Sequence, residues 1–140
     1  MDPIVTLTDA PDEAAKAAIT NGLLEFNDGM SGGSDRRALA VLVSDPATGK
    51  PVGGLIGRTS LGVLLIELFY LPDHLRGSGL GRRVVQQAEE EARRRGCVSA
   101  VLYTISFQAP GFYERCGYRR FGEVPGANGV SRIFLSKSLA

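Results

Sequence analysis

Two groups of residues in this sequence have types and spacings that could do chemistry. The first is the glycine-rich stretch R-G-S-G-L-G at residues 76–81, which lies between a long apolar run and a run with helical periodicity. Glycine lets the backbone approach a ligand closely and adopt positive φ without steric cost. The first N–H groups of a helix have no intrahelical partner and lie at the positive end of the helix dipole. The stretch therefore predicts a site for a phosphate or pyrophosphate.

The spacing of the glycines separates this stretch from other phosphate-binding loops. The dinucleotide fingerprint G-x-G-x-x-G would need a glycine at Arg82, and no G-x-x-x-x-G-K-[ST] segment occurs. The pattern that does occur is R-x-x-G-x-G, from Arg76 to Gly81. It resembles the acetyl-CoA pyrophosphate loop of the GNAT-type N-acetyltransferase superfamily.

The second group is A-P-G-F-Y-E-R-C-G-Y at residues 109–118. It resembles the second motif of the same superfamily, A-x-x-F-Y-x-x-x-G-[FY], and follows the glycines by one predicted strand. The surrounding segment, with the pair Phe26 and Asn27, is similar to small bacterial GNAT proteins. The resemblance implies direct transfer of an acetyl group from acetyl-CoA to an amine, with no metal.

Such a transfer makes three chemical demands, and two residues are candidates to meet them. The amine must lose a proton, the carbonyl oxygen needs a hydrogen-bond donor, and the departing thiolate benefits from a proton. Tyr113 matches the superfamily's tyrosine acid; the alternative is a packed aromatic ring. Glu67, a lone carboxylate in an apolar run, is the candidate base, directly or through water, because such a group is costly to bury unless it is paired or used. The alternative is a carboxylate satisfied by a hydroxyl or by Arg58.

The resemblance also implies a cofactor path. Pyrophosphate would sit on the N–H groups from Arg76 through Arg82, and pantetheine would follow the strand that ends near Leu71, where it parts from a parallel neighbour. Ser106 stands where the superfamily commonly has asparagine. Arg82 and Arg83 would either contact the 3′-phosphate of the cofactor or be charges on the helix surface, and the sequence does not decide between the two. The implied cofactor-binding residues are Phe69, Tyr70, Leu71, Arg76, Gly77, Ser78, Gly79, Leu80, Gly81, Arg82, Ser106, Pro110 and Phe112.

The elements that must position these residues form an expected α/β fold with a mixed sheet of six to seven strands. Apolar runs and turn signals predict an antiparallel meander, one parallel βαβ unit and a closing hairpin. Helices are expected from an N-cap at Asp9 to about Phe26, from the glycines to Gly96, and briefly from Pro110 to Gly117. The charges at 89–95 predict a solvated helix face. The predicted strands are 4–7, 38–43, 51–59, 63–71, 98–104, 119–123 and 130–135.

Composition limits the class of protein. The chain has 140 residues, 44% of them hydrophobic, and a net charge of +1, which fits a single domain over 1–140 and disfavours nucleic acid or a membrane as the main partner. The two cysteines indicate reduced thiols and a cytoplasmic location, and with one histidine they make no convincing metal site.

The leading function is an acetyl-CoA-dependent N-acetyltransferase acting on a small-molecule amine. The alternatives are a catalytically silent acyl-CoA-binding module and a peptide, protein or aminoacyl acetyltransferase. The acceptor would lie among the loops 27–37, 59–62 and 124–129, whose residues do not identify it, and a homodimer is left open.

Overall fold

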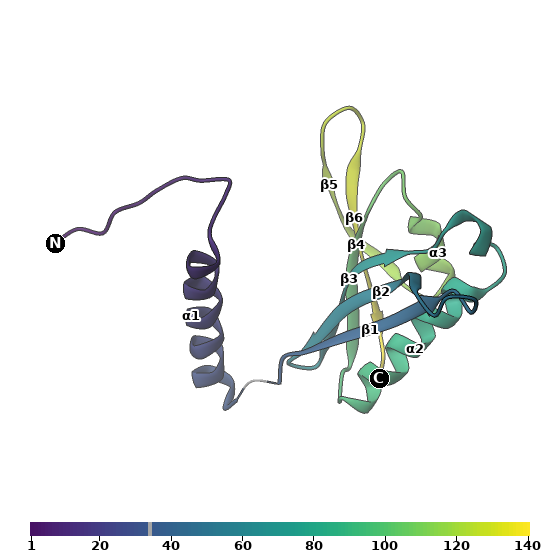
Figure 1. The fold of residues 1–140 in the computed structure, drawn as a ribbon, viewed down its shortest axis with the longest axis horizontal. Helices are drawn as coiled ribbons and strands as arrows, with labels where there is room; N and C mark the ends of the chain where they lie inside the picture. Colours follow the sequence, from purple (N-terminus) through teal and green to yellow (C-terminus); the bar gives the residue numbers. More distant parts are fainter. Residues whose placement is uncertain (34) are drawn as a thin grey trace. The chain divides into compact units, whose positions relative to one another are not determined.

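The computed structural model describes residues 1–33 and 35–140, and these two stretches are separate compact units (Figure 1). The first unit consists of an N-terminal segment and one helix. The second contains the whole sheet and both predicted motifs. Each unit is described by itself.

The first unit is built on α1, Glu13–Ser31. Its N-cap is Asp12, whose side chain accepts a 2.8 Å hydrogen bond from the Ala15 N–H, and not Asp9 as expected. The helix also continues past Phe26, because Gly29 does not stop it. It ends where Gly32 adopts left-handed backbone (φ 87°) and its N–H bonds the Asp28 carbonyl at 3.0 Å.

The predicted strand at residues 4–7 is wrong, because these residues adopt no strand conformation. A strand is stable only when a neighbouring edge accepts its backbone hydrogen bonds, and no other described residue of the first unit forms a strand.

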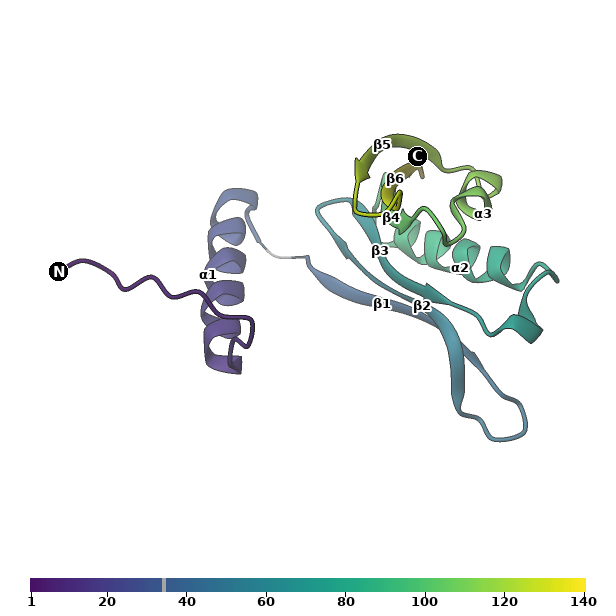
Figure 2. The ribbon, with the colours of Figure 1, turned by 90° about the horizontal axis from the view of Figure 1, so that it is seen from above.

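The second unit is a mixed sheet whose strands run in the order β1-β2-β3-β4-β6-β5 (Figures 1 and 2). Its pairings are antiparallel except that of β3 with β4, which confirms the expected α/β fold with one parallel unit. The strands are β1 (Arg37–Ser44), β2 (Pro51–Ser60), β3 (Val63–Tyr70), β4 (Ser99–Ile105), β5 (Arg119–Pro125) and β6 (Ser131–Ser138).

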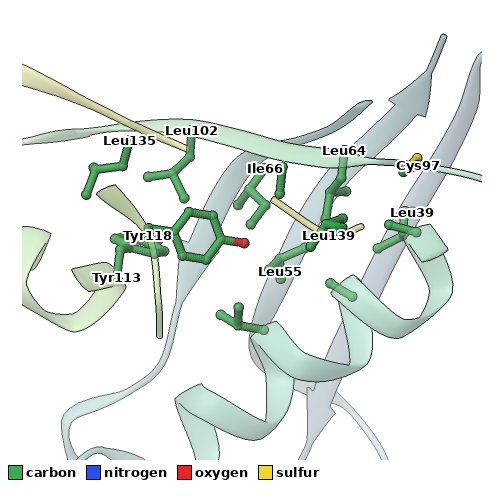
Figure 3. Packing of buried hydrophobic residues seen from close by; sticks show 14 of the residues in the cluster. Leu39, Leu55, Leu64, Ile66, Cys97, Leu102, Tyr113, Tyr118, Leu135 and Leu139 are labelled. Carbon is green, nitrogen blue, oxygen red and sulfur yellow. The ribbon is translucent and has the colours of Figure 1, made fainter. Parts of the chain in front are cut away.

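Two helices and one short turn complete this unit: η1 (Asp73–Leu75), α2 (Leu80–Arg94) and α3 (Pro110–Arg115). Figure 2 shows α2 running along one face of the sheet. The helix buries Val84, Val85, Ala88 and Ala92 against this face. The side chains of Leu55, Leu64, Leu102 and Leu135, drawn in Figure 3, form the centre of the core beneath it. Their burial supplies the main stabilisation of the unit.

One expectation about α2 is wrong. The charge run was expected to lie on a solvated face, and Glu91 does pair there with Arg94. Arg95 instead turns toward the sheet, where its Nη1 donates hydrogen bonds to the Ala38 carbonyl at 3.0 Å and the Thr59 hydroxyl at 3.1 Å. Glu89, however, is only 2% exposed. It lies four residues after Val85 and three before Ala92, so the helical period places it on the buried stripe.

Two irregularities of β3 shape the region that follows it. Parallel pairing with β4 covers only Val63 to Leu65, so the two strands part before either ends, as the resemblance implied. Against β2, the register jumps between Ile66 and Leu68 and leaves Glu67 as the extra residue of a bulge. A bulge bends a strand and redirects the side chain it carries.

Candidate functional site

The glycine turn offers a continuous row of free backbone donors. Gly77 and Gly79 have left-handed φ values of 80° and 85°, which only glycine adopts without strain. The N–H of Arg76 bonds the Asp73 carbonyl at 3.1 Å, and the N–H of Arg83 bonds the Gly79 carbonyl at 3.2 Å. Among the described residues, the N–H groups from Gly77 to Arg82, which lie between these two, have no acceptor. Their position at the start of α2 suits an anion.

The side chain of Arg76 holds this turn in place. Its Nε donates a 2.7 Å hydrogen bond to the Leu71 carbonyl, and its Nη1 pairs with Asp73 at 2.8 Å. The guanidinium also lies 5.8 Å from the centre of the Tyr70 ring. Arg76 therefore connects the end of β3 to the glycine turn.

An aromatic cluster lies beside the turn and orients α3. Phe112 stands 5.5 Å from Phe69 and 5.1 Å from Tyr113 between ring centres. A Cβ on Gly81 would lie 3.1 Å from the Phe112 ring, so a larger residue there would require this ring to shift. The glycine spacing thus serves helix packing as well as anion binding.

Tyr113 is the buried titratable group of α3. It is 8% exposed, and burial raises its pKa to about 12. Within the described part of the chain its hydroxyl has no hydrogen-bond partner, yet the oxygen is not sealed from solvent. The phenol therefore stays protonated near neutral pH and is free to donate.

The glycine turn and Tyr113 line one cavity of about 820 Å³. Most of the predicted site residues are brought together there. They are Phe69, Tyr70, Leu71, Arg76, Gly77, Gly79, Gly81, Arg82, Phe112 and Tyr113.

Five predicted site residues do not line this cavity: Glu67, Ser78, Leu80, Ser106 and Pro110. Glu67 pairs with Arg58 at 2.8 Å across β2 and β3. The Ser106 hydroxyl oxygen accepts a 3.0 Å hydrogen bond from the Ser131 N–H, so it connects the end of β4 to the start of β6. Pro110 is the first residue of α3.

Six further residues line the cavity but were not predicted as site residues: Thr104, Phe107, Gln108, Ala109, Arg115 and Cys116. The Gln108 side chain accepts hydrogen bonds from the Thr104 hydroxyl at 2.8 Å and the Ile105 N–H at 2.9 Å, which shapes the loop before α3. Ala109, Arg115 and Cys116 carry a sequence signal, since they lie inside the second motif. The others depend on where the loop folds.

Two features are absent from the residues that the structure describes. None of their helices has the length and apolar character needed to cross a membrane. No three His, Cys, Asp or Glu side chains in the described ranges converge on a metal-sized site.

Comparison with known proteins gives a consistent result. The model of the Acetyltransferase (GNAT) family matches residues 10–118. An acetyltransferase of Agrobacterium fabrum is 36% identical over 94% of this chain and 96% of its own length. Blasticidin-S acetyltransferase of Streptomyces morookaense is 39% identical over 65% of this chain and 68% of its own. A crystal structure of an acetyltransferase from Agrobacterium tumefaciens is 34% identical, with a TM-score of 0.90 over 97% of this chain and 99% of that one.

Proposed function

This chain belongs to the GNAT family of acetyltransferases and is an N-acetyltransferase enzyme, and from that premise we propose that it transfers the acetyl group of acetyl-CoA directly to the amine of a small molecule. The observation that carries the proposal is the shared cavity. The cavity is lined both by Gly77, Gly79 and Gly81, which belong to the turn with free backbone donors, and by Tyr113, whose hydroxyl is protonated.

The N–H groups from Gly77 to Arg82 are suited to hold the pyrophosphate of the co-substrate. The part of β3 that has left β4 offers the pantetheine arm a backbone edge without a neighbouring strand near Phe69, and the Leu71 carbonyl beyond it is bonded by Arg76. Phe112 supplies an apolar wall. Acetyl-CoA would bring the thioester, which is the activated acetyl group.

In this proposal Tyr113 acts late in the reaction. Its raised pKa keeps the proton available, and the hydroxyl donates it as the thiolate departs. Glu67 serves as base through water, because it lies outside the cavity lining and its carboxylate is half-exposed. Cys116 lines the cavity, but burial raises the pKa of its thiol and disfavours the nucleophilic thiolate. Direct transfer therefore fits better than an acyl-cysteine intermediate.

A small-molecule acceptor is supported by the 39% identity to an enzyme named for blasticidin-S. The near-neutral net charge of +1 favours it over a polyanionic acceptor. We further propose that residues 1–140 act as one acetyltransferase domain in the cytoplasm, where acetyl-CoA and reduced thiols occur together.

The test is steady-state release of free CoA thiol from acetyl-CoA in the presence of a panel of small amines, with mass spectrometry of the products. We expect turnover with at least one small amine and an added acetyl mass on it. Binding of acetyl-CoA without thiol release would assign the chain to the silent binding modules. Turnover only with peptides or aminoacyl compounds would assign it to the other alternative class.

A further inference from the structure

Glu89 is a carboxylate inside the core of the sheet unit. The residue is 2% exposed, and both of its oxygens are used. Oε1 accepts a 3.0 Å hydrogen bond from Nζ of Lys137, and Oε2 accepts a 2.8 Å hydrogen bond from the Tyr118 hydroxyl. Lys137 is half-buried, and well-packed apolar residues often replace a buried carboxylate and its cation without loss of stability. Stability alone therefore gives no reason for charges at this place.

Lys137 also binds the C-terminal end of α3. Its Nζ donates a 2.8 Å hydrogen bond to the carbonyl of Cys116, the residue that follows the helix. A cation is favourable at the C-terminus of a helix. Gly117 leaves room for the lysine, because a Cβ there would lie 3.3 Å from Lys137 Cε.

We call the hydrogen-bonded group of Glu89, Lys137, Tyr118 and the Cys116 carbonyl the clamp. Two of its members, Cys116 and Tyr118, are in direct contact with Tyr113. The N–H groups of Cys116 and Tyr118 both bond the Tyr113 carbonyl at 3.0 Å. The rings of Tyr113 and Tyr118 meet edge to face with 6.0 Å between their centres, and Figure 3 shows them in the same part of the core. A helix of six residues has little stability of its own, so these contacts must fix its direction.

We propose that Lys137 and Glu89 are positioning residues for acetyl transfer, which hold the end of α3 so that the Tyr113 hydroxyl faces the cavity. The inference rests on the proposed function, in which this hydroxyl donates the proton. Glu89 belongs to the helix that begins at the glycine turn, so the clamp also sets α3 relative to the cofactor site.

The first test is a double-mutant cycle with Lys137→Met and Tyr113→Phe, measured as turnover per folded molecule. We expect Lys137→Met to lower kcat by about 10-fold or more with little change in the KM for acetyl-CoA. The double variant should be no slower than Tyr113→Phe alone, because the lysine acts through the tyrosine. If the double variant loses kcat by the product of the two single-variant losses, the lysine acts independently of the tyrosine and the proposal is overturned.

Two matched controls separate positioning from general stability. Leu135→Ala removes a fully buried side chain two residues before Lys137 in β6. It should lower the melting temperature while turnover per folded molecule holds. Lys16→Met makes the same chemical change at a solvated pair with Glu13 and should alter neither property. A loss of kcat with Leu135→Ala equal to that of Lys137→Met would count against the clamp.

A measurement without turnover keeps this inference distinct from the proposed function. The chain has four tyrosines, so tyrosine labelled with ¹³C at the ring carbon that carries the hydroxyl gives few signals, and Tyr113→Phe assigns the one of interest. In Lys137→Met we expect the Tyr113 signal to shift or broaden and that of Tyr103 to stay. An unchanged Tyr113 signal would refute positioning even if the enzyme is active. A shifted signal in a chain that acetylates no amine would refute only the proposed chemistry.

A third variant covers the case in which Lys137→Met does not fold. Combining Glu89→Met, Lys137→Met and Tyr118→Phe removes the three polar side-chain groups of the clamp and leaves no buried charge unpaired. We expect this protein to fold and to keep its affinity for acetyl-CoA, while its kcat falls by about 10-fold or more. Wild-type kcat in the triple variant would overturn the proposal.

Discussion

Arg58 and Glu67 form a 2.8 Å ion pair across β2 and β3, at the bulge that turns Glu67 out of the regular pleat. Their side chains are 35% and 40% exposed, so solvent screens the pair and its contribution to stability is about 0–1 kcal/mol. Glu67 can therefore be changed with little effect on folding. This makes its chemical role testable by substitution.

We expect Glu67→Gln to lower turnover most at low pH, where most of the amine is protonated and needs a base. Loss of general-base help should cost roughly 10²–10⁴-fold, while the melting temperature stays near that of the wild type. The measurement is kcat/KM for the amine across pH.

Glu114→Gln is the matched control for this change. Glu114 is another half-exposed carboxylate, paired at 3.1 Å with Arg120. It should leave the pH profile unaltered. Equal rates for Glu67→Gln and wild type at every pH would return Glu67 to a structural role with Arg58.

The glycine turn predicts that acetyl-CoA or CoA raises the melting temperature. Ligand at about 100 times its dissociation constant stabilises the folded state by about 2.7 kcal/mol. Gly79→Val should abolish the shift, because Gly79 has φ 85° and a branched side chain would move the free N–H groups. Thermal melts with and without CoA measure it.

Gly49→Val carries the same backbone strain away from the site. Gly49 has φ 71° in the turn between β1 and β2, and like Gly79 it has no atom within 4 Å of a built Cβ. This variant should be destabilised yet keep its shift with CoA. A wild-type protein without a shift at millimolar CoA would contradict the pyrophosphate site itself.

The loss of folding stability at alkaline pH should depend on the two buried tyrosines, Tyr113 and Tyr118. Burial raises the pKa of Tyr113 from 10.0 to about 12. Burial and the Glu89 carboxylate also raise the pKa of Tyr118. Because the unfolded chain loses these protons first, the stabilisation present below pH 10 should be lost as the pH rises toward 12.

The measurement is the melting temperature as a function of pH, with tyrosinate absorbance followed in parallel. Tyr113→Phe should make the alkaline loss shallower. Tyr103→Phe removes the hydroxyl of a ring that is 56% exposed and should leave the curve as it is. Identical curves for wild type, Tyr113→Phe and Tyr103→Phe would show that Tyr113 has the same pKa in the folded and the unfolded chain.

Local patterns in the sequence predicted the frame of the site well. Glycines at every second position, followed by four-residue apolar spacing, predicted both the turn and α2. The motif around Tyr113 predicted a short helix between Pro110 and Gly117, and the structure has α3 there.

What the sequence did not predict depends on contacts between distant residues. Glu89 was read with its charged neighbours, although its partners are Lys137 and Tyr118, 48 and 29 positions away. The cavity walls at Thr104 and Gln108 depend on a loop whose shape is set by side-chain hydrogen bonds. The extent of α1 was underestimated because the polar and glycine-rich residues 27–37 were predicted to be a loop, although α1 continues to Ser31 and Gly32 ends it.

The final prediction separates binding from chemistry at Tyr113. Tyr113→Phe keeps the ring that contacts Phe112 and Tyr118 and removes only a hydroxyl without a protein partner in the described residues. The core should therefore stay intact. If the hydroxyl protonates the departing thiolate, its effect belongs to the transition state. We expect kcat and kcat/KM to fall together by about 10- to 1,000-fold, or roughly 1.4 to 4 kcal/mol, with acetyl-CoA affinity unchanged.

Tyr118→Phe is the informative comparison, because its hydroxyl is bound to Glu89 at 2.8 Å. Its removal leaves one oxygen of a buried carboxylate without its donor and should lower the melting temperature. Tyr113→Phe should leave the melting temperature unchanged and lower kcat, whereas Tyr118→Phe should lower the melting temperature. The assay is single-turnover CoA release at saturating acetyl-CoA, where the chemical step limits the rate. Equal rates for Tyr113→Phe and wild type under these conditions would remove the Tyr113 hydroxyl from the mechanism, and the proton would then have to reach the thiolate from water.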